Sequence, residues 1–532
     1  MPSICSACGA PVIPTSDNFE LRLSFTPTDP QILARIVELS GTNEPPRDYE
    51  LSLFLPIVDK TRLANLNAEI SQLKTSLRQL EEERTALSIY HDENSRIFSP
   101  LRRMPPELLG EIFSWTLPST RDIFDTEDCP WILTRVCSSW RAVALSIPSL
   151  WSLIVIDFPA QRRYSLKMIS TQIERARSLK IHFFGSQNRR PRRQVALFRL
   201  LAEHSTRWEE FSIQLTSHLV PEMNLDFPSL RRAWVQWDTP ESQPSEFDSI
   251  DFFRTASSLI DIRIFHNFRS LPTRLHLPHQ LARYDFDAPW KVHCELLKSL
   301  PNLQEVRIVR TFDDNEDWPE LGEPIDLSSL RRLYVNDPTC LDYLRAPGLD
   351  EIAIGTITGT NTSETARFLE HFLMRSSCSP HCLRIRGLLD AQSMAAILHK
   401  YPSFAELVMT DEAPNDEATK REILANFLAL FTISNLTPSN MVLPHITKIG
   451  FACQDADVAF YTHFVDMLES RRNSGSALMA AELVFLNSRP DPDPLSFVRL
   501  ETLREDGLQI LLLSEDAASD HIGRWFLRTA WV

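Results

Sequence analysis

The chain contains 532 residues, of which 43% are hydrophobic and 23% are charged, and its formal net charge is −15. This composition excludes a chain that is disordered throughout, and the acidic balance argues against a nucleic-acid partner. No apolar run reaches the roughly 18 residues that a membrane-spanning helix needs, and the N-terminus does not resemble a secretory signal. We therefore expect no membrane partner and a location in the cytoplasm, the nucleus or both.

The first 98 residues divide into two predicted segments. Residues 1–56 are rich in Pro, Thr, Ser and Asp, and we expect them to be largely disordered or loosely docked. Residues 57–98 are predicted to form a heptad helix, because apolar residues alternate spacings of three and four. These residues are Leu63, Leu66, Ile70, Leu73, Leu77 and Leu80, and Leu87 resumes the stripe after Arg84. Two alternatives remain open: self-association through 57–94 as a coiled coil, or a single helix packed on its own chain.

Residues 99–156 are predicted to form a small all-helical domain. The segment 104–117 reads MPPELLGEIFSWTL, and its paired prolines suit the first turn of a helix, where no backbone donor is needed. After an acidic loop, the segment from Trp131 places Leu133, Val136, Trp140 and Val143 at helical spacing. Pro148 ends this second helical stretch.

Residues 157–532 contain a recurring sequence phrase. It consists of a turn, an apolar residue, two variable residues, a second apolar residue, one variable residue and a third apolar residue. Copies include FPSLRRAWVQ (227–236), LPNLQEVRIV (300–309) and LSSLRRLYVN (327–336). The aligned apolar anchors are Leu230, Leu259, Leu281, Leu303, Leu330, Leu349, Phe404 and Ile446. Degenerate copies are expected at Trp208/Phe211/Ile213, Leu383/Ile385 and Leu483/Phe485. Self-similarity at a drifting period of about 20–30 residues indicates a solenoid of strand-plus-helix units.

Each predicted strand turns one apolar face inward and is too short to bury that face alone, so parallel copies must stack. Helical segments such as 364–374 and 391–399 would cover the outer side of the array. The other face of the strands carries large or charged residues, and Trp234, Arg307 and Tyr334 are candidate substrate-binding residues there, because aromatic and Arg side chains often anchor interfaces. The alternative for Trp234 and Tyr334 is that each merely covers neighbouring strands. If all three side chains lie open, replacing them with Ala should leave the melting temperature nearly unchanged.

The pattern Met104-Pro-Pro-Glu-Leu-Leu-x-Glu-Ile-Phe, followed by Val136-Cys-x-x-Trp140 and Pro148-x-Leu-Trp151, resembles an F-box, and most of all the large fungal F-box family. That family commonly has a preceding heptad helix and a leucine-rich-repeat-like array, which this chain resembles only loosely. Met104 departs from the Leu that is usual in the family, and the acidic loop 119–128 alters the spacing between the two halves. The fold expected is therefore α/β: a heptad helix and a small helical F-box, followed by a leucine-rich-repeat-like solenoid.

The resemblance implies a non-catalytic substrate receptor that docks on the Skp-type adaptor of a Skp–cullin–F-box ubiquitin ligase. It assigns adaptor contact to Pro105, Leu108, Leu109, Ile112, Leu133, Val136 and Trp140. The alternative for any one of these residues, above all Val136 and Trp140, is a place in the core of the helical unit. The alternative for the chain is a repeat scaffold with a vestigial F-box that recruits no ligase. The substrate itself is not indicated by the sequence.

Catalytic and metal-binding patterns are weak. No phosphate-binding loop, nucleophile elbow or zinc-protease motif occurs, so an enzyme in the array is the least favoured class. Cys5 and Cys8 form a CxxC, which is half of a zinc ribbon, but no second CxxC follows. Cys378, His381 and Cys382 complete such a site only if distant regions meet. We expect no metal and no cofactor.

Overall fold

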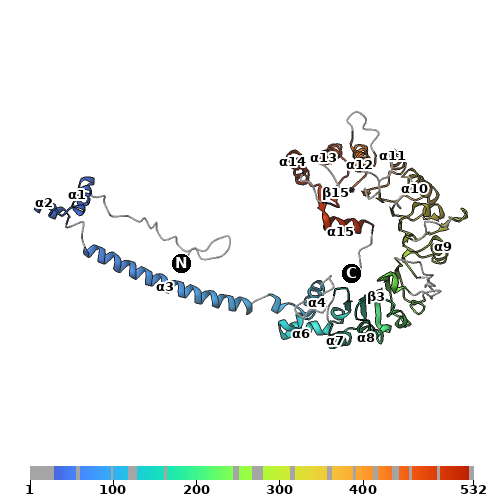
Figure 1. The fold of residues 1–532 in the computed structure, drawn as a ribbon, viewed down its shortest axis with the longest axis horizontal. Coiled ribbons are helices and arrows are strands. Elements are labelled where there is room, and N and C mark those ends of the chain that lie inside the picture. The colour runs from blue at the N-terminus through green and yellow to red at the C-terminus, as the bar shows by residue number, and fades with distance from the viewer. Residues whose placement is uncertain are drawn as a thin grey trace. The chain divides into compact units, whose positions relative to one another are not determined.

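The computed structural model describes residues 29–54, 60–97, 100–117, 129–160, 164–243, 251–266, 280–311, 318–355, 362–387, 391–410, 417–433, 442–454, 458–487 and 492–526. The chain divides into two compact units, residues 1–104 and 105–532. Figure 1 shows the helices and strands of both, with many of the helices labelled.

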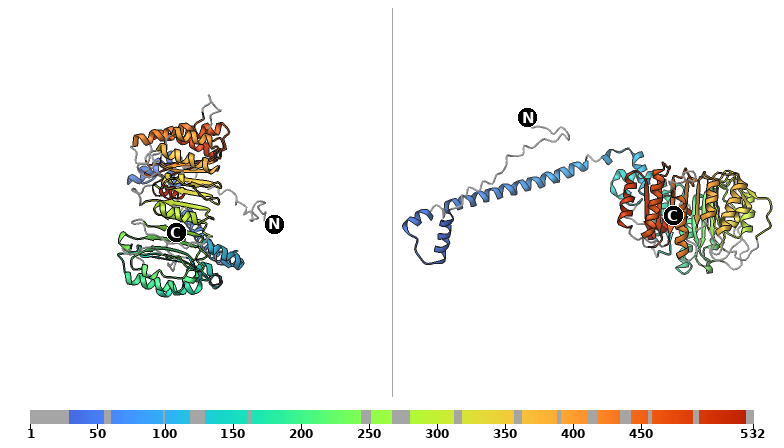
Figure 2. Two further views of the ribbon diagram at one scale, coloured as in Figure 1. Left: turned by 90° about the vertical axis from the view of Figure 1, so that its right-hand side faces the viewer. Right: turned by 90° about the horizontal axis from the view of Figure 1, so that it is seen from above.

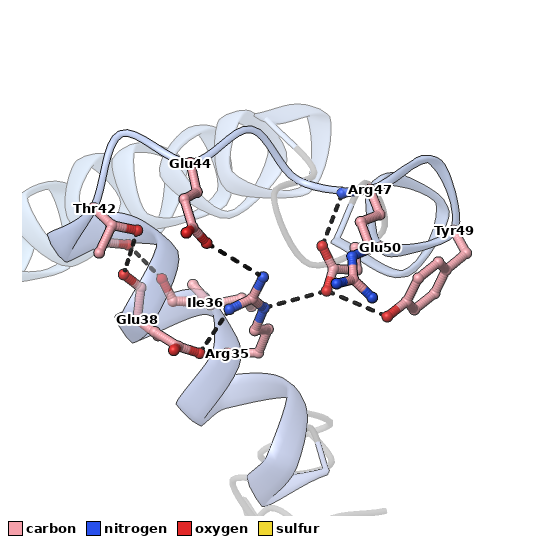
Figure 3. Close-up of polar contacts among 9 residues, drawn as sticks. Arg35, Ile36, Glu38, Thr42, Glu44, Arg47, Tyr49 and Glu50 are labelled. Atoms are coloured by element: carbon pink, nitrogen blue, oxygen red, sulfur yellow. Dashed lines mark hydrogen bonds and ion pairs between the residues drawn. The ribbon is translucent and has the colours of Figure 1, made fainter.

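The first unit contains two short helices that the sequence did not predict. These are α1 (Pro30–Gly41) and α2 (Asp48–Phe54). The side chain of Asp29 accepts a hydrogen bond from the backbone of Gln31, and Pro30 occupies the first turn, which is a typical helix start. Arg35 of α1 pairs with the almost buried Glu50 of α2 at 3.2 Å (Figure 3). The expectation of disorder is therefore wrong for residues 30–54, while residues 1–28 lie outside the described residues.

The predicted heptad helix is confirmed as α3 (Lys60–Ile97), which is 38 residues long. All six stripe residues from Leu63 to Leu80 are 47–63% exposed, and Leu87 is 60% exposed. Within the first unit the stripe is thus an exposed apolar face, and both alternatives for its partner, a second copy or another part of this chain, remain predictions.

The second unit begins with the helices of the predicted F-box. They are α4 (Pro106–Trp115), α5 (Leu133–Val136) and α6 (Ser138–Ser146), followed by the 3₁₀-helix η2 (Pro148–Trp151). The acidic loop, residues 119–128, lies outside the described residues. Just before α4, the 3₁₀-helix η1 (Pro100–Arg103) ends the first unit.

The rest of the second unit is built on a 14-stranded parallel sheet whose strand order follows the chain. Its strands are β1 (Leu153–Asp157), β2 (Leu179–Phe184), β3 (Trp208–Leu215), β4 (Arg232–Trp237), β5 (Asp261–Phe265), β6 (Arg283–Asp287), β7 (Glu305–Val309), β9 (Arg332–Val335), β11 (Glu351–Ile354), β12 (Cys382–Arg386), β13 (Glu406–Thr410), β14 (Lys448–Cys453), β15 (Ala480–Phe485) and β16 (Gln509–Ser514). A separate short pair, β8 (Ile325–Asp326) and β10 (Leu344–Arg345), lies outside this sheet.

Helices follow most strands and lie on the outer side of the arc that the strands form in Figure 1, and Figure 2 shows the strands side by side from the first repeats to the last. These helices are α7 (Leu166–Arg175), α8 (Pro191–Ala202), α9 (Trp290–Ser299), α10 (Thr362–Ser376), α11 (Ala391–Lys400), α12 (Glu417–Phe431), α13 (Val458–Asn473) and α14 (Pro494–Glu505). Short 3₁₀-helices replace them in other repeats: η4 (Val220–Glu222), η5 (Pro240–Ser242) and η6 (Pro338–Tyr343). A further one, η3 (Ser205–Arg207), follows α8 before β3. The last helix, α15 (Glu515–Phe526), lies instead on the inner side of the arc.

The solenoid prediction is confirmed: the fold is α/β, with a long parallel sheet consistent with a leucine-rich-repeat-like array. All eight predicted anchors, from Leu230 to Ile446, are at most 3% exposed. The three degenerate copies correspond to β3, β12 and β15, and the predicted helices at 364–374 and 391–399 are α10 and α11.

One boundary differs from the prediction. Residues 153–156, which were assigned to the F-box, belong to β1, and this strand pairs with β2 in parallel register. Arg175 of α7 stacks over the ring of Trp151 at 4.3 Å, so the helical segment packs directly against the first repeat. The helices before β1 therefore cap the end of the sheet, as terminal elements of a solenoid must.

Candidate functional site

Helix α4 has one buried apolar face and one exposed apolar face. Leu109 and Phe113 are at most 2% exposed and pack into the core of the helical segment. Leu108, Ile112 and Trp115 are spaced by four and three residues, so they share the opposite side of the helix, and they are 56%, 40% and 87% exposed. We call these three residues the α4 stripe. An exposed row of large apolar side chains is a typical mark of a protein-docking surface.

The position of the α4 stripe is fixed by tight packing behind the helix. The ring of Phe113 lies 4.9 Å from that of Trp140 on α6. Gly110 faces Ile147 so closely that a Cβ atom there would come within 2.6 Å of the Ile147 Cδ1 atom. The indole nitrogen of the fully buried Trp151 donates a 2.9 Å hydrogen bond to the carbonyl of Ala144. The α4 stripe is therefore presented on a rigid support.

The seven residues assigned to adaptor contact fall into two groups in the structure. Pro105, Leu108, Ile112 and Val136 are exposed, and Trp140 is half-buried against Phe113. Leu109 and Leu133 are only 2% and 4% exposed, so they belong to the core of the helical segment rather than to its surface. This corrects the expectation for these two. Trp115 was absent from the set, although its spacing from Ile112 placed it on the same helix face.

The inner face of the sheet carries a row of alternating charges. Side chains at one register position change sign from strand to strand between β2 and β11, in the order Lys180, Glu210, Arg232, Asp261, Arg283, Glu305, Arg332 and Glu351. Neighbours in this row form ion pairs, for example Arg283 with Glu305 at 3.0 Å and Arg332 with Glu305 at 2.5 Å. The row therefore neutralises itself, because opposite charges on adjacent strands stabilise each other.

A second row lies two residues further along the same strands. From β4 to β12 it contains Trp234, Arg263, Asp285, Arg307, Tyr334, Ala353 and Arg384. Arg263 and Arg307 flank Asp285, with ion pairs of 3.9 and 3.5 Å. The Arg307 guanidinium also stacks over the ring of Tyr334. Unlike the first row, this one contains more cations than anions.

Helix α15 covers the inner face over the later strands. Its residues Ala518, Ile522, Trp525 and Phe526 pack against a line of mostly small side chains: Tyr334, Ala353, Val408, Ala452 and Val484. Gly450 makes room for the Trp525 indole, because a Cβ there would lie 3.3 Å from Cζ2 of that ring. The indole nitrogen of Trp525 donates a 2.9 Å hydrogen bond to Glu482. The apolar half of the inner face is thus occupied by the chain itself.

The three candidate substrate-binding residues share the inner face, as predicted, but they do not form one open surface. Arg307 and Tyr334 lie on adjacent strands and are 7% and 8% exposed. Arg307 donates a hydrogen bond to the backbone of Phe526 on α15, and Tyr334 packs against the apolar side chains of the same helix. Trp234 lies three strands from Arg307 and packs against Phe184, with ring centres 6.3 Å apart. The expectation that Arg307 and Tyr334 lie open is therefore wrong, because the sequence did not place α15 above them.

The candidate metal ligands are not gathered in the described residues. Cys5 and Cys8 lie outside them. Burial raises the pKa of the Cys378 thiol to about 11 and that of Cys382 to about 12, so both favour the protonated form rather than the thiolate that binds metal. His381 is exposed and pairs with Asp350 at 3.3 Å. No cluster of three metal-binding side chains occurs in the described part of the chain.

Comparison of the chain with models of known protein families and with curated proteins gives no match. Within the described ranges, no helix is both long enough and apolar enough to cross a membrane.

Proposed function

We propose that this protein is a non-catalytic F-box subunit of a Skp–cullin–F-box ubiquitin ligase. In this proposal the helical segment docks on the Skp-type adaptor, and the solenoid binds the protein to be ubiquitinated. The setting is the cytoplasm or the nucleus. The observation that carries the proposal is the α4 stripe: three large apolar side chains exposed on a helix whose other face is a packed core.

The energetics favour a partner over free solvent at this surface. Covering a fully exposed Leu or Ile side chain contributes about 1.5–3 kcal/mol, and the cost of ordering is small because α4 is already held by Phe113 and Gly110. Trp115, the most exposed of the three, belongs to the residue type that most often dominates binding energy at interfaces. The sequence order of the two F-box halves supports an adaptor as the partner.

Co-expression with a Skp-type adaptor tests the proposal. The wild-type chain should co-purify with the adaptor, and the double variant Leu108→Asp/Ile112→Asp should lose it, because two carboxylates would be buried without partners. The variant should keep its fold because both side chains face solvent in the free protein. A matched control is Leu495→Asp/Val498→Asp, which makes the same change on exposed aliphatic residues of α14.

Two results would contradict the proposal. One is a wild-type chain that does not retain the adaptor, which would favour a repeat scaffold with a vestigial F-box. The other is equal retention by the α4 and α14 variants, which would show that the α4 stripe is not the docking surface. Leu109→Asp is expected to unfold the helical segment, which separates a core position from a docking position on the same helix.

A further inference from the structure

A pocket of about 620 Å³ lies on the inner face, between the strands and the C-terminal end of α15. Its lining runs from Lys180 on β2 to Arg384 on β12. These two strands are the first and the last of nine neighbouring strands in the sheet. Strands lie about 4.8 Å apart, so the pocket extends over roughly 35–40 Å. The volume is thus distributed along a channel rather than in one round cavity.

The channel carries an excess of positive charge. In the described part of the chain, eight basic side chains line it: Lys180, Arg232, Arg263, Arg283, Arg307, Arg332, Arg384 and Arg524. Three glutamates also line it, and the two aspartates that pair with the arginines, Asp261 and Asp285, are each 1% exposed beneath them. Counted over the described residues, the excess is therefore three positive charges, on a chain whose net charge is −15.

The excess lies in the second row and on α15. The first row alternates in sign and contributes no net charge. Arg263 and Arg307 share one carboxylate, and Arg384 pairs with Glu351 of the first row at 2.9 Å. Arg524 is exposed on α15, lines the channel and adds a further cation there. Arg263 and Arg307 are only 9% and 7% exposed and attract an anion through their field, whereas the Arg524 guanidinium is exposed to direct contact with an anion from solvent.

We infer that this channel binds an acidic peptide segment of another protein, in an extended conformation. Guanidinium groups donate forked hydrogen bonds to carboxylates and phosphates, so Asp, Glu or phosphorylated side chains supply the matching chemistry. An extended chain rises about 3.3 Å per residue, and about eleven residues therefore match the length of the channel. A nucleic acid fits less well, because its continuous charge would be repelled by the acidic remainder of the protein.

The identification of this peptide as part of a ubiquitination substrate rests on the proposed function, but its binding does not. Arg524 is the residue of choice for the test because its side chain is exposed, whereas its neighbours Trp525 and Phe526 make the packing contacts of α15. Arg254 is the matched control, an exposed arginine that does not line the channel. Both can be reversed to Glu with little effect on folding.

Binding can be measured with the full chain and a fluorescently labelled peptide of about twelve residues, half of them Glu. The companion probes are the same peptide with Gln in place of Glu, the same peptide with phosphoserine, and a single-stranded oligonucleotide of equal charge. The Glu peptide, the phosphoserine peptide or both should bind, with an affinity that falls as salt rises. The Gln peptide should not bind.

Arg524→Glu should weaken peptide binding by at least about fivefold, which corresponds to one partly exposed ion pair, and Arg254→Glu should leave it unchanged. Absence of binding by both anionic peptides, equal effects of the two variants, or equal binding of the oligonucleotide would each overturn the inference. The Leu108→Asp/Ile112→Asp variant should still bind the peptide, and Arg524→Glu should still retain the adaptor. A failure of the channel and a failure of the adaptor proposal are therefore distinguished.

Discussion

The guanidinium carbon of Arg307 lies 4.2 Å from the ring centre of Tyr334, and its Nη1 atom donates a 3.1 Å hydrogen bond to the backbone carbonyl of Phe526. One arginine thereby connects β7, β9 and α15, although 219 residues separate it from Phe526. The contact shows that α15 is an integral part of the inner face over these strands.

Replacing Arg307 should therefore destabilise the fold. Arg307→Ala removes a guanidinium that is 7% exposed and weakens the compensation of the buried carboxylate of Asp285, and the expected cost is about 3 kcal/mol. Urea unfolding followed by circular dichroism measures this loss. Arg254→Ala, at an exposed arginine, should change the free energy of unfolding by no more than about 0.5 kcal/mol.

Two substitutions of Tyr334 separate the contribution of its ring from that of its hydroxyl group. Tyr334→Phe keeps the ring beneath the Arg307 guanidinium and should cost less than Tyr334→Ala, which also removes packing against α15. The triple change of Trp234, Arg307 and Tyr334 to Ala should thus lower the melting temperature, contrary to what the sequence predicts. If Arg307→Ala and Arg254→Ala unfolded at the same urea concentration, Arg307 would not stabilise the contact between the sheet and α15.

The repeat architecture could be predicted because each repeat carries its own local signal. Leu230 and Leu303 follow turn residues and precede two alternating apolar residues, and this pattern is sufficient to predict a strand of the array. Strands β1, β2 and β16 were missed for different reasons. Pro148 and Leu150 before β1 were assigned to the F-box, and no turn phrase precedes β2. The run 510–513 of β16 is apolar at every position, so the alternation that marks the other strands is absent.

The place of α15 could not be predicted for a different reason. The spacing of Ala518, Ile522 and Trp525 predicts an amphipathic helix, but it does not say which face of the sheet that helix covers. The choice depends on small residues far away in the sequence, such as Ala353 and Gly450, which make room on the inner face. The same limit affected the F-box, where helical periodicity alone did not separate the buried Leu109 from the exposed Leu108.

Three buried histidines make the fold sensitive to acid. His182, His266 and His293 are at most 2% exposed, and burial lowers the pKa of each from 6.5 to about 4. His293 is held in place by the hydroxyl of Tyr284 at 2.7 Å. Between pH 6.5 and 4 the unfolded chain takes up protons that the folded chain refuses, so the free energy of unfolding must fall as the pH falls through this range.

The slope approaches about 1.4 kcal/mol per pH unit for each histidine. Lowering the pH from 7.5 to 5.5 should therefore reduce stability by about 1 kcal/mol for each of the three, measured from urea midpoints at the two pH values. His293→Gln should reduce the difference in the free energy of unfolding between the two pH values by about 1 kcal/mol, whatever its effect on stability at either pH. The exposed His399→Gln is the control and should leave the difference as it is in the wild type. An unchanged difference in His293→Gln would contradict the depressed pKa of His293.

The stripe on α3 is expected to bind a second copy of this chain. Its six residues from Leu63 to Leu80 follow the 3.5-residue spacing of a two-stranded coiled coil, and each is about half exposed or more. Deleting residues 57–94 should therefore convert a dimer into a monomer, which sedimentation at micromolar concentration can detect. The deletion removes α3 without touching unit 2, so the melting of the solenoid provides an internal check on folding.

A point variant tests the same surface with the helix intact. Leu73→Lys/Leu77→Lys places two like charges in the middle of the stripe, where pairing with a second helix would bury them, and should give a monomer. Thr75→Lys/Gln79→Lys adds the same charge at the same spacing on another face of α3, where all four positions are exposed, and should leave the dimer intact. Sedimentation of the wild-type chain as a monomer, or dissociation of both lysine variants alike, would show that the stripe does not mediate self-association.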